Sequence, residues 1–409
     1  MRVRRCRVRR ANRASERIVV TEAPQANDVP GAGEDDRPWR QADIDLDAVA
    51  SNVHRLRQIA GTEHLIAVVK ANGYGHGAFE CAHAALAGGA DWLGVADVAE
   101  ALALRGAGIE APILAWLHDA QADFGAAVTG GISIGISSLR QLDAVADAAR
   151  SSGRAASVQL KIDTGLSRNG VPRGDWVAVF EAAHAAELAG QLRVDGIFSH
   201  VSNASIEDDE AAARVFDGAL ELAHAAGLAP SLVHLAATAA TLWAPSTRYN
   251  TVRVGIGIYG LSPFADRTSA DIGLTPAMTL RTRVAGVRRV PAGTGVSYGY
   301  TYRTEHETTL ALVPLGYGDG VPRQASNKGT VAINGGTFRA CGRIAMDQFV
   351  VDVGDHAVEV GDDVVLFGNA ATGVPAADDW ALAADTINYE IVTRIGNRVV
   401  RRYRAAQWT

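Results

Sequence analysis

Short apolar runs rich in β-branched residues alternate with Ala- and Leu-rich segments of helical period in this chain, from about Asp43 to Ile256. Such an alternation indicates βαβ units, in which each helix leads back to the next strand of a parallel sheet. Eight such units favour an α/β fold of the (β/α)8 barrel (TIM) type. A doubly wound open sheet is the alternative, but no Gly-rich dinucleotide turn follows the first predicted strand. The predicted strands are Leu65–Val69, Trp92–Val95, Pro112–Trp116, Ile132–Ile136, Val158–Ile162, Val194–Phe198, Leu232–Leu235 and Val252–Ile256.

The predicted helices lie between these strands, and after about Ile272 they give way to short strands separated by turn signals. We therefore expect a barrel domain over residues 41–272 and a C-terminal mostly-β domain over residues 273–409. The predicted helices are Leu46–Ile59, Ala78–Ala87, Val98–Arg105, Leu139–Ala149, Trp176–Ala189 and Ala211–Ala226. The predicted C-terminal elements are the strands Thr279–Val290, Thr308–Pro314, Thr330–Ile333, Thr337–Ala340, Phe349–Val353 and Asp363–Phe367, a helix over Trp380–Ile387 and a last strand ending at Arg402.

The first forty residues differ from the rest of the chain. An Arg-rich run is followed by a stretch rich in Pro, Gly, Asp and Glu that ends near Pro38. A secretory signal needs a longer apolar core than Ile18–Val20 offers. A basic tail that binds nucleic acid is an alternative, but we expect residues 1–40 to be a disordered extension or the result of a start codon assigned too early.

Charge and cysteine content exclude several classes of function. The net charge of −6 gives no electrostatic reason to expect nucleic acid or an anionic membrane as a partner. No apolar run reaches the roughly 18 residues that span a bilayer. The cysteines Cys6, Cys81 and Cys341 are too few and too scattered for a disulfide framework or a metal site. A reducing compartment fits, and we expect a cytoplasmic protein without a metal.

A lysine closes the first predicted strand of the barrel. Polar residues at the C-terminal ends of barrel strands form the active site, and here Lys70 is followed by the segment Ala71–Gly77, which is rich in Gly and contains Tyr and His. A single lysine at such a place more often extends its ammonium to solvent. The mobile backbone and polar groups that follow favour a bound anion instead.

The segment Ala67–Gly77 resembles the cofactor-lysine motif of the alanine racemase family, and the similarity extends over most of the chain after the first forty residues. The resemblance implies a homodimeric isomerase that depends on pyridoxal 5'-phosphate. It interconverts L-alanine and D-alanine and supplies D-alanine for cell-wall peptidoglycan synthesis. It also implies that Lys70 binds the cofactor covalently and acts as a catalytic base, and that the hydroxyl of Tyr74 contacts the phosphate.

Further strand ends match family positions. Without the family, Lys161 and Arg168 read as part of a salt-bridge cluster. The resemblance implies that Arg168 lies near the cofactor and the substrate carboxylate, and that Lys161 matches a lysine that carries a carbamate in many members. His200 matches a histidine stacked beside the pyridine ring, although a lone histidine is more often a satisfied core residue. Arg253 matches an arginine that donates to the pyridine nitrogen.

The loops after the seventh and eighth predicted strands are those that cradle phosphate in many barrels. They offer Thr238, in place of a serine usual in the family, together with Gly255 and Ile256. Ala237 replaces a usual asparagine and Val254 a usual proline, so substrate range or cofactor affinity can differ from the family's.

The C-terminal domain is expected to complete the site. Tyr298, in the segment Gly295–Tyr302, matches the family's second catalytic base; composition alone favours a packed tyrosine. Tyr317 and Met346 match residues on the substrate side, and Tyr389 a phosphate-contacting tyrosine. Tyr298, Tyr317 and Met346 would reach the site of the neighbouring subunit, which implies shared active sites.

Two bases on opposite faces of the substrate are a simple route to racemisation, and Lys70 and Tyr298 fill these places. Because a tyrosine of ordinary pKa near 10 is a poor base at neutral pH, we expect positive charge from Arg253, relayed through His200, to favour the phenolate. The alternatives are a racemase of serine, lysine or another amino acid, a decarboxylase or aldolase on the same barrel, and a cofactor-binding protein without turnover.

Overall fold

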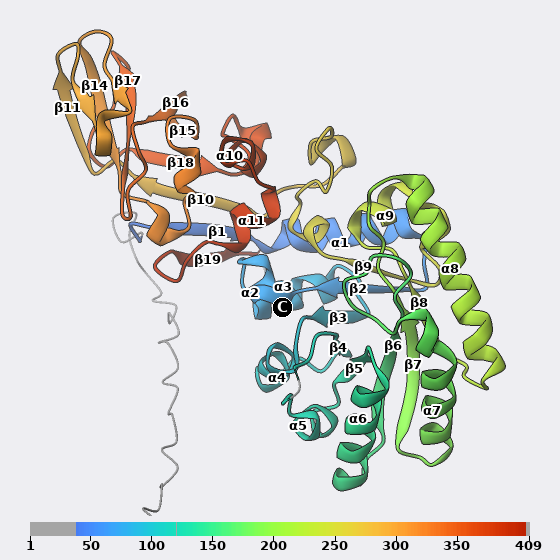
Figure 1. Cartoon of the computed structure of the whole chain (residues 1–409). Helices are drawn as coiled ribbons and strands as arrows, with labels where there is room; N and C mark the ends of the chain where they lie inside the picture. Colours follow the sequence, from blue (N-terminus) through green and yellow to red (C-terminus); the bar gives the residue numbers. More distant parts are fainter. Residues whose placement is uncertain (1–37, 120, 406–409) are drawn as a thin grey trace, which may run out of the picture. The chain divides into compact units, whose positions relative to one another are not determined.

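The computed structural model describes residues 38–119 and 121–405. A closed parallel barrel runs in the order β2 to β9 (Figure 1), which confirms the predicted fold class. The predicted barrel strands agree with the observed ones to within a few residues. The observed strands are β2 (His64–Val68), β3 (Trp92–Val95), β4 (Ile113–Ala115), β5 (Ser133–Ile136), β6 (Ala156–Lys161), β7 (Leu192–Phe198), β8 (Leu232–His234) and β9 (Thr251–Val254).

The barrel strands are buried on both faces, which explains their nearly continuous apolar sequences. All four residues of β5 and of β9 are buried, for example. Most of the helices that cover the barrel begin at side-chain caps; for example, Asp45 accepts from Ala48 N and Ser138 from Gln141 N. These helices are α1 (Leu46–Ala60), α3 (Ala78–Ala87), α4 (Val98–Gly106), α5 (Phe124–Thr129), α6 (Leu139–Ser152), α7 (Trp176–Leu188) and α8 (Ile206–Ala225).

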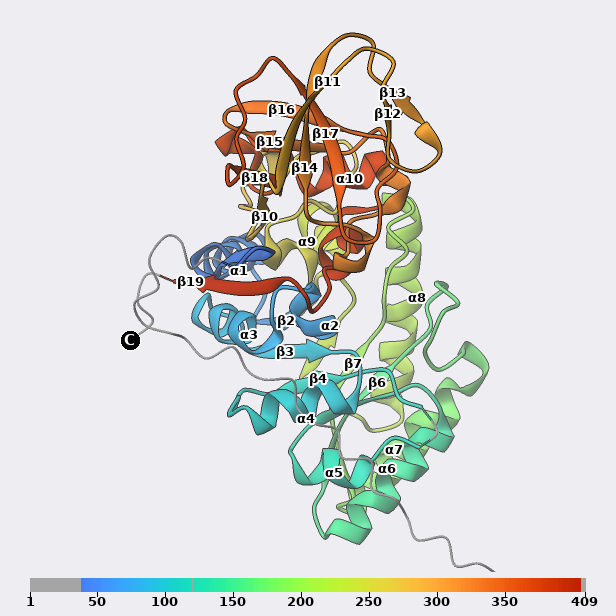
Figure 2. The ribbon, with the colours of Figure 1, turned by 90° about the vertical axis from the view of Figure 1, so that its left-hand side faces the viewer.

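The C-terminal part forms a nine-stranded sheet in the order β11-β14-β17-β16-β15-β18-β10-β1-β19. A separate two-stranded sheet joins β12 (Gly295–Val296) to β13 (Tyr302–Arg303) (Figure 2). The strands of the large sheet not yet given are β10 (Met278–Arg283), β11 (Gly286–Val290), β14 (Thr308–Val313), β15 (Thr330–Ile333), β16 (Gly336–Cys341), β17 (Phe349–Gly354), β18 (Asp363–Phe367) and β19 (Val400–Arg404).

Two predictions for this part were wrong in detail. The single strand predicted over Thr279–Val290 is two strands, because the chain changes partner between them: β10 pairs with β18 and β11 with β14. The helix predicted over Trp380–Ile387 is α10 (Ala377–Ala384), which ends at the left-handed Asp385. A further short helix, α11 (Asn388–Thr393), follows it.

Strand β1 (Gln41–Asp45) lies within the range expected for the barrel but belongs to the C-terminal sheet. It pairs antiparallel with β10 and parallel with β19, and the chain then enters the barrel through α1. The domain limits at residues 40 and 272 stay predictions, and residues 1–37 of the expected extension lie outside the described residues. No helix of residues 38–119 and 121–405 is long and apolar enough to cross a membrane.

Candidate active site

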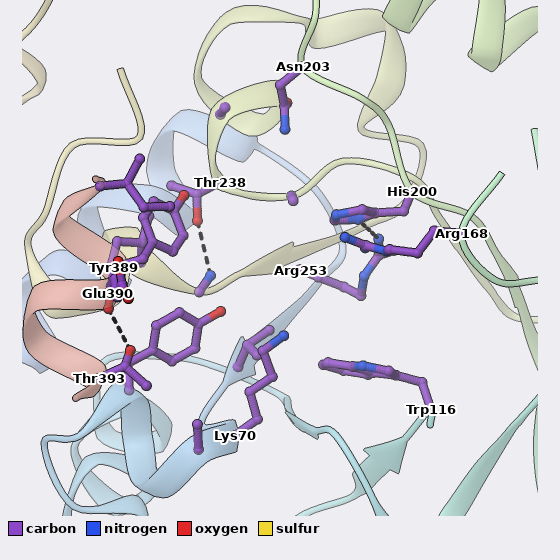
Figure 3. Close-up of a pocket in the computed structure, with 18 of the residues that line it drawn as sticks. Lys70, Trp116, Arg168, His200, Asn203, Thr238, Arg253, Tyr389, Glu390 and Thr393 are labelled. Atoms are coloured by element: carbon purple, nitrogen blue, oxygen red, sulfur yellow. Dashed lines mark hydrogen bonds between the residues drawn. The ribbon is translucent and has the colours of Figure 1, made fainter. Parts of the chain in front are cut away.

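A cavity of about 660 Å³ opens at the carboxyl ends of the barrel strands, and most of the predicted site residues line it (Figure 3). Lys70 follows β2, Lys161 ends β6 and His200 follows β7, as the strand-end rule predicts. Tyr389 reaches the cavity from α11 of the C-terminal part. The predicted residues that line the cavity are Lys70, Tyr74, Lys161, Arg168, His200, Thr238, Arg253, Gly255, Ile256 and Tyr389.

The cavity is rich in positive charge. Lys161 and Arg253 are buried, Lys70 is partly buried and Arg168 is exposed. None of these four side chains forms an ion pair with a carboxylate in residues 38–119 and 121–405, where other residues form such pairs. Burial and then the charge of Arg168 lower the pKa of Lys70. Burial, followed by Arg253 and Arg168, lowers the pKa of Lys161 to about 8. The arrangement therefore favours an anionic ligand.

Arg253 is held by neutral acceptors. Its Nη1 donates to His234 Nδ1 at 2.7 Å, and its Nη2 donates to Ser199 O at 2.7 Å and to His200 Nδ1 at 3.2 Å. Because a guanidinium only donates, both Nδ1 atoms are acceptors and both imidazoles, when neutral, carry their proton on Nε2. His234 Nε2 then donates to Gln159 Oε1 at 2.7 Å. The tautomer of His200 directs an N–H away from Arg253.

Burial and the surrounding cations keep His200 neutral. Burial, then Arg253 and Arg168, lower the pKa of His200 to about 3. At neutral pH His200 is therefore uncharged, and its ring is held in place by the hydrogen bond from Arg253.

A second group of residues suits a phosphate. Gly255 N donates to Thr238 Oγ1 at 3.0 Å. A Cβ at Gly255 would lie 2.5 Å from the hydroxyl oxygen of Tyr74, so only glycine leaves that space open. Burial raises the pKa of Tyr389 to about 12 and that of Tyr74 as well. Both phenols therefore remain neutral donors. The donor set, the open space at Gly255 and the excess of positive charge fit a phosphate-bearing cofactor.

Tyr298, Tyr317 and Met346 do not line this cavity. They are 71%, 41% and 53% exposed, respectively. Tyr317 N donates to Ala345 O at 3.1 Å and Gly318 N to Met346 O at 2.8 Å, and Ala345 lines a second cavity together with Tyr298. The three residues thus lie together on an exposed surface of the C-terminal part.

Sequence reasoning missed several residues of the cavity. Trp116 ends a predicted strand, and its ring centroid lies 5.7 Å from Lys70 Nζ; the same strand-end rule would have found it. Asn203 and Glu390 line the cavity from loops and helix ends, where no local signal marks them. His234 was missed because it is buried behind Arg253 and does not line the cavity.

A lysine at a strand end of a (β/α)8 barrel, beside a phosphate cradle and a buried arginine, defines the class of barrel enzymes that bind pyridoxal phosphate on a lysine. Comparison with known proteins narrows this class. The sequence profile of the alanine racemase N-terminal domain matches residues 44–263, and that of the alanine racemase C-terminal domain matches residues 277–403.

The alanine racemase of Thermobifida fusca is 50% identical over 372 residues, which cover 90% of this chain and 99% of that protein. The crystal structure of the alanine racemase from Streptomyces lavendulae has a TM-score of 0.89 at 48% identity and covers 91% of this chain and 98% of that one. The alanine racemase of Streptomyces coelicolor has a TM-score of 0.88 at 47% identity, with 89% and 98% covered.

The chain belongs to the alanine racemase family. Enzymes of this family are amino-acid racemases that depend on pyridoxal phosphate and act on a small amino acid. Within the described residues, no cluster of His, Cys, Asp or Glu side chains could hold a metal ion.

Proposed function

We propose that this chain interconverts L-alanine and D-alanine with Lys70 and Tyr298 of the partner subunit as the two bases, and so supplies D-alanine for cell-wall synthesis. The observation that carries this assignment is the placement of Lys70 between the phosphate cradle and the arginine pair Arg168 and Arg253. An amine of lowered pKa in a positive cavity is suited to give up and accept a proton near neutral pH.

Pyridoxal phosphate, when bound, supplies the electron sink that makes the Cα proton of the substrate acidic. The side chains of Tyr74, Thr238 and Tyr389 and the backbone of Gly255 and Ile256 would hold its phosphate. Arg253 would donate to its ring nitrogen, because a guanidinium has no acceptor.

Lys70 would move the proton at the Cα of D-alanine, and Tyr298 of the partner subunit the proton at the Cα of L-alanine on the opposite face. The Nε2–H of His200 points away from Arg253, so it could donate to the phenol oxygen of Tyr298 of the partner subunit. The charge of Arg253, acting through this neutral imidazole, would favour the phenolate of Tyr298.

The substrate carboxylate would be bound by Arg168 and by the backbone N–H of Met346 of the partner subunit, with Tyr317 of the partner subunit beside it. Ala237 lines the cavity with a methyl group only. This leaves room for a larger side chain, so a broader racemase that also accepts serine or lysine is the second candidate. A panel of L-amino acids assayed for racemisation separates the two.

A homodimer follows from this assignment, because Tyr298, Tyr317 and Met346 lie outside the cavity that holds Lys70. Exposed aromatic and methionine side chains that lie together are typical of interfaces. The patch therefore supports a shared site in which each subunit completes the cavity of the other.

Mixing two inactive variants tests the proposal. In a K70A–Y298F heterodimer, one site would carry both substitutions and the other neither. Random reassociation of equal amounts makes half the dimers mixed, each with one of two sites intact, so about a quarter of wild-type activity should return. If both bases come from one subunit, the mixture stays inactive. K70A mixed with a second preparation of K70A is the control.

A further inference from the structure

The turn that follows Lys70 has an unfavourable backbone. Ala71, Asn72 and Tyr74 have φ angles of 51°, 53° and 51°, and Gly73 between them has a φ of 61°. A left-handed conformation is unfavourable for alanine and tyrosine, whereas glycine and, to a lesser degree, asparagine tolerate it. Such a conformation persists only where the surroundings hold it.

Glu100 holds the first residue of this turn. Its Oε1 accepts from Ala71 N at 2.7 Å, and its Oε2 accepts from Ala96 N at 2.8 Å. Glu100 lies in the first turn of α4, whose N-cap is Asp97. One carboxylate therefore ties the residue next to Lys70 to the end of the neighbouring barrel strand.

The other contacts of the turn act further from Lys70. Asn72 Oδ1 accepts from Ala78 N at 3.0 Å, and Arg401 Nε donates to Gly75 O at 3.1 Å. Among the side chains that the structure describes, only that of Glu100 forms a hydrogen bond with the backbone of Ala71. Its loss would free the backbone next to Lys70 while the rest of the turn stays held.

Glu100 also supplies negative charge near the Lys70 amine. It raises the pKa of Lys70, whereas burial, Arg168 and Arg253 lower it. Most of the groups with which Lys70 shares the cavity are positive or neutral, among them Arg168, Arg253, Lys161 and His200. One further carboxylate, Glu390, also lines the cavity and lies 3.9 Å from Arg394. Glu100, which lies outside the cavity, therefore offsets part of the lowering of the Lys70 pKa by Arg168 and Arg253.

We propose that Glu100 is a positioning residue for Lys70: its carboxylate fixes the left-handed turn that directs the lysine side chain into the cavity. The inference rests on the proposed role of Lys70 and adds to it a residue outside the cavity.

The test compares E100A and E100Q with D97A in the full chain. Asp97 caps the same helix by accepting from Glu100 N at 2.9 Å but does not contact Ala71, so D97A reports the effect of a weakened α4 alone. Three quantities are measured: the rate at which added pyridoxal phosphate becomes attached to Lys70 of the cofactor-free enzyme, kcat in both directions, and the midpoint of thermal unfolding.

E100A is expected to lower both the attachment rate and kcat on the order of 10- to 100-fold, because a displaced reacting group loses rate steeply. E100Q keeps one acceptor oxygen and should lose less activity. Because the negative charge near Lys70 is gone, the acidic limb of its pH–rate profile for D-alanine should move to lower pH. D97A should lower the unfolding midpoint with little change in attachment rate.

Wild-type attachment and turnover in E100A would overturn the inference, and so would an equal loss in D97A. If borohydride fails to lock the cofactor onto Lys70 in the wild-type enzyme, the proposed function fails instead, and the two failures are distinguishable.

Discussion

Replacing Arg253 by lysine should destabilise the protein although the charge is kept. The two terminal nitrogens of Arg253 serve His234 Nδ1, His200 Nδ1 and the carbonyl oxygens of Ser199, His234 and Leu235 at 2.7–3.2 Å. His234 O also accepts from Ser199 N and keeps a partner. Four acceptors thus depend on the guanidinium.

A lysine ammonium carries its three donors on one atom and cannot reach acceptors that two separate nitrogens serve. We expect R253K to leave about two of the four unpartnered, and each buried unpaired acceptor costs about 1–3 kcal/mol. The free energy of unfolding should therefore fall by about 2–6 kcal/mol. Urea denaturation of the cofactor-free chain, monitored by tryptophan fluorescence, measures this change.

R168K is the matched control, because Arg168 is exposed and should change the free energy of unfolding by less than about 0.5 kcal/mol. A loss below about 1 kcal/mol in R253K would refute the view that this network holds the strand ends together.

Three further predictions concern charge. The pKa of Lys161 is lowered to about 8, so its amine becomes neutral above that pH and should combine with CO2 to form a carbamate, with release of a proton. A carbamate signal from isotope-labelled bicarbonate should therefore grow as the pH rises through about 8. The signal should be absent in K161A. The pKa values of His76 and His200 are lowered to about 4 and about 3. As the pH falls below about 6.5, these two histidines therefore become protonated in the unfolded chain while they stay neutral in the folded chain. The stability to urea should drop over this pH range, and it should drop less steeply in H76Q. Arg398 forms ion pairs with Asp319 and with Asp347, the residue that follows Met346. Because Met346 is proposed to bind the substrate carboxylate, R398Q should raise KM for alanine several-fold with a smaller change in kcat. An unchanged KM would argue against a role of Arg398 in holding Met346.

The barrel could be predicted closely because its signal is local. A strand buried on both faces must be apolar along its whole length, and a helix that covers it must repeat every three to four residues, so both patterns are visible in the sequence. The strand-end rule then placed Lys70, Lys161 and His200 at one mouth of the barrel.

Strand β1 and the break between β10 and β11 were not visible, because they depend on which distant strand a segment pairs with. The left-handed turn at Ala71–Tyr74 was also missed: neither Ala nor Tyr favours that conformation, and it is held by Glu100 from another helix.

The sequence by itself determined the alternation that closes the barrel and the family motif around Lys70. Only the tertiary structure decided the tautomers of His200 and His234, the lowered pKa values of Lys70 and Lys161, and the separation of Tyr298 from the cavity. The physical reason is that hydrophobic periodicity depends on residues that are close in the sequence. A tertiary hydrogen bond or a shifted pKa depends on groups that folding brings together from distant parts of the chain.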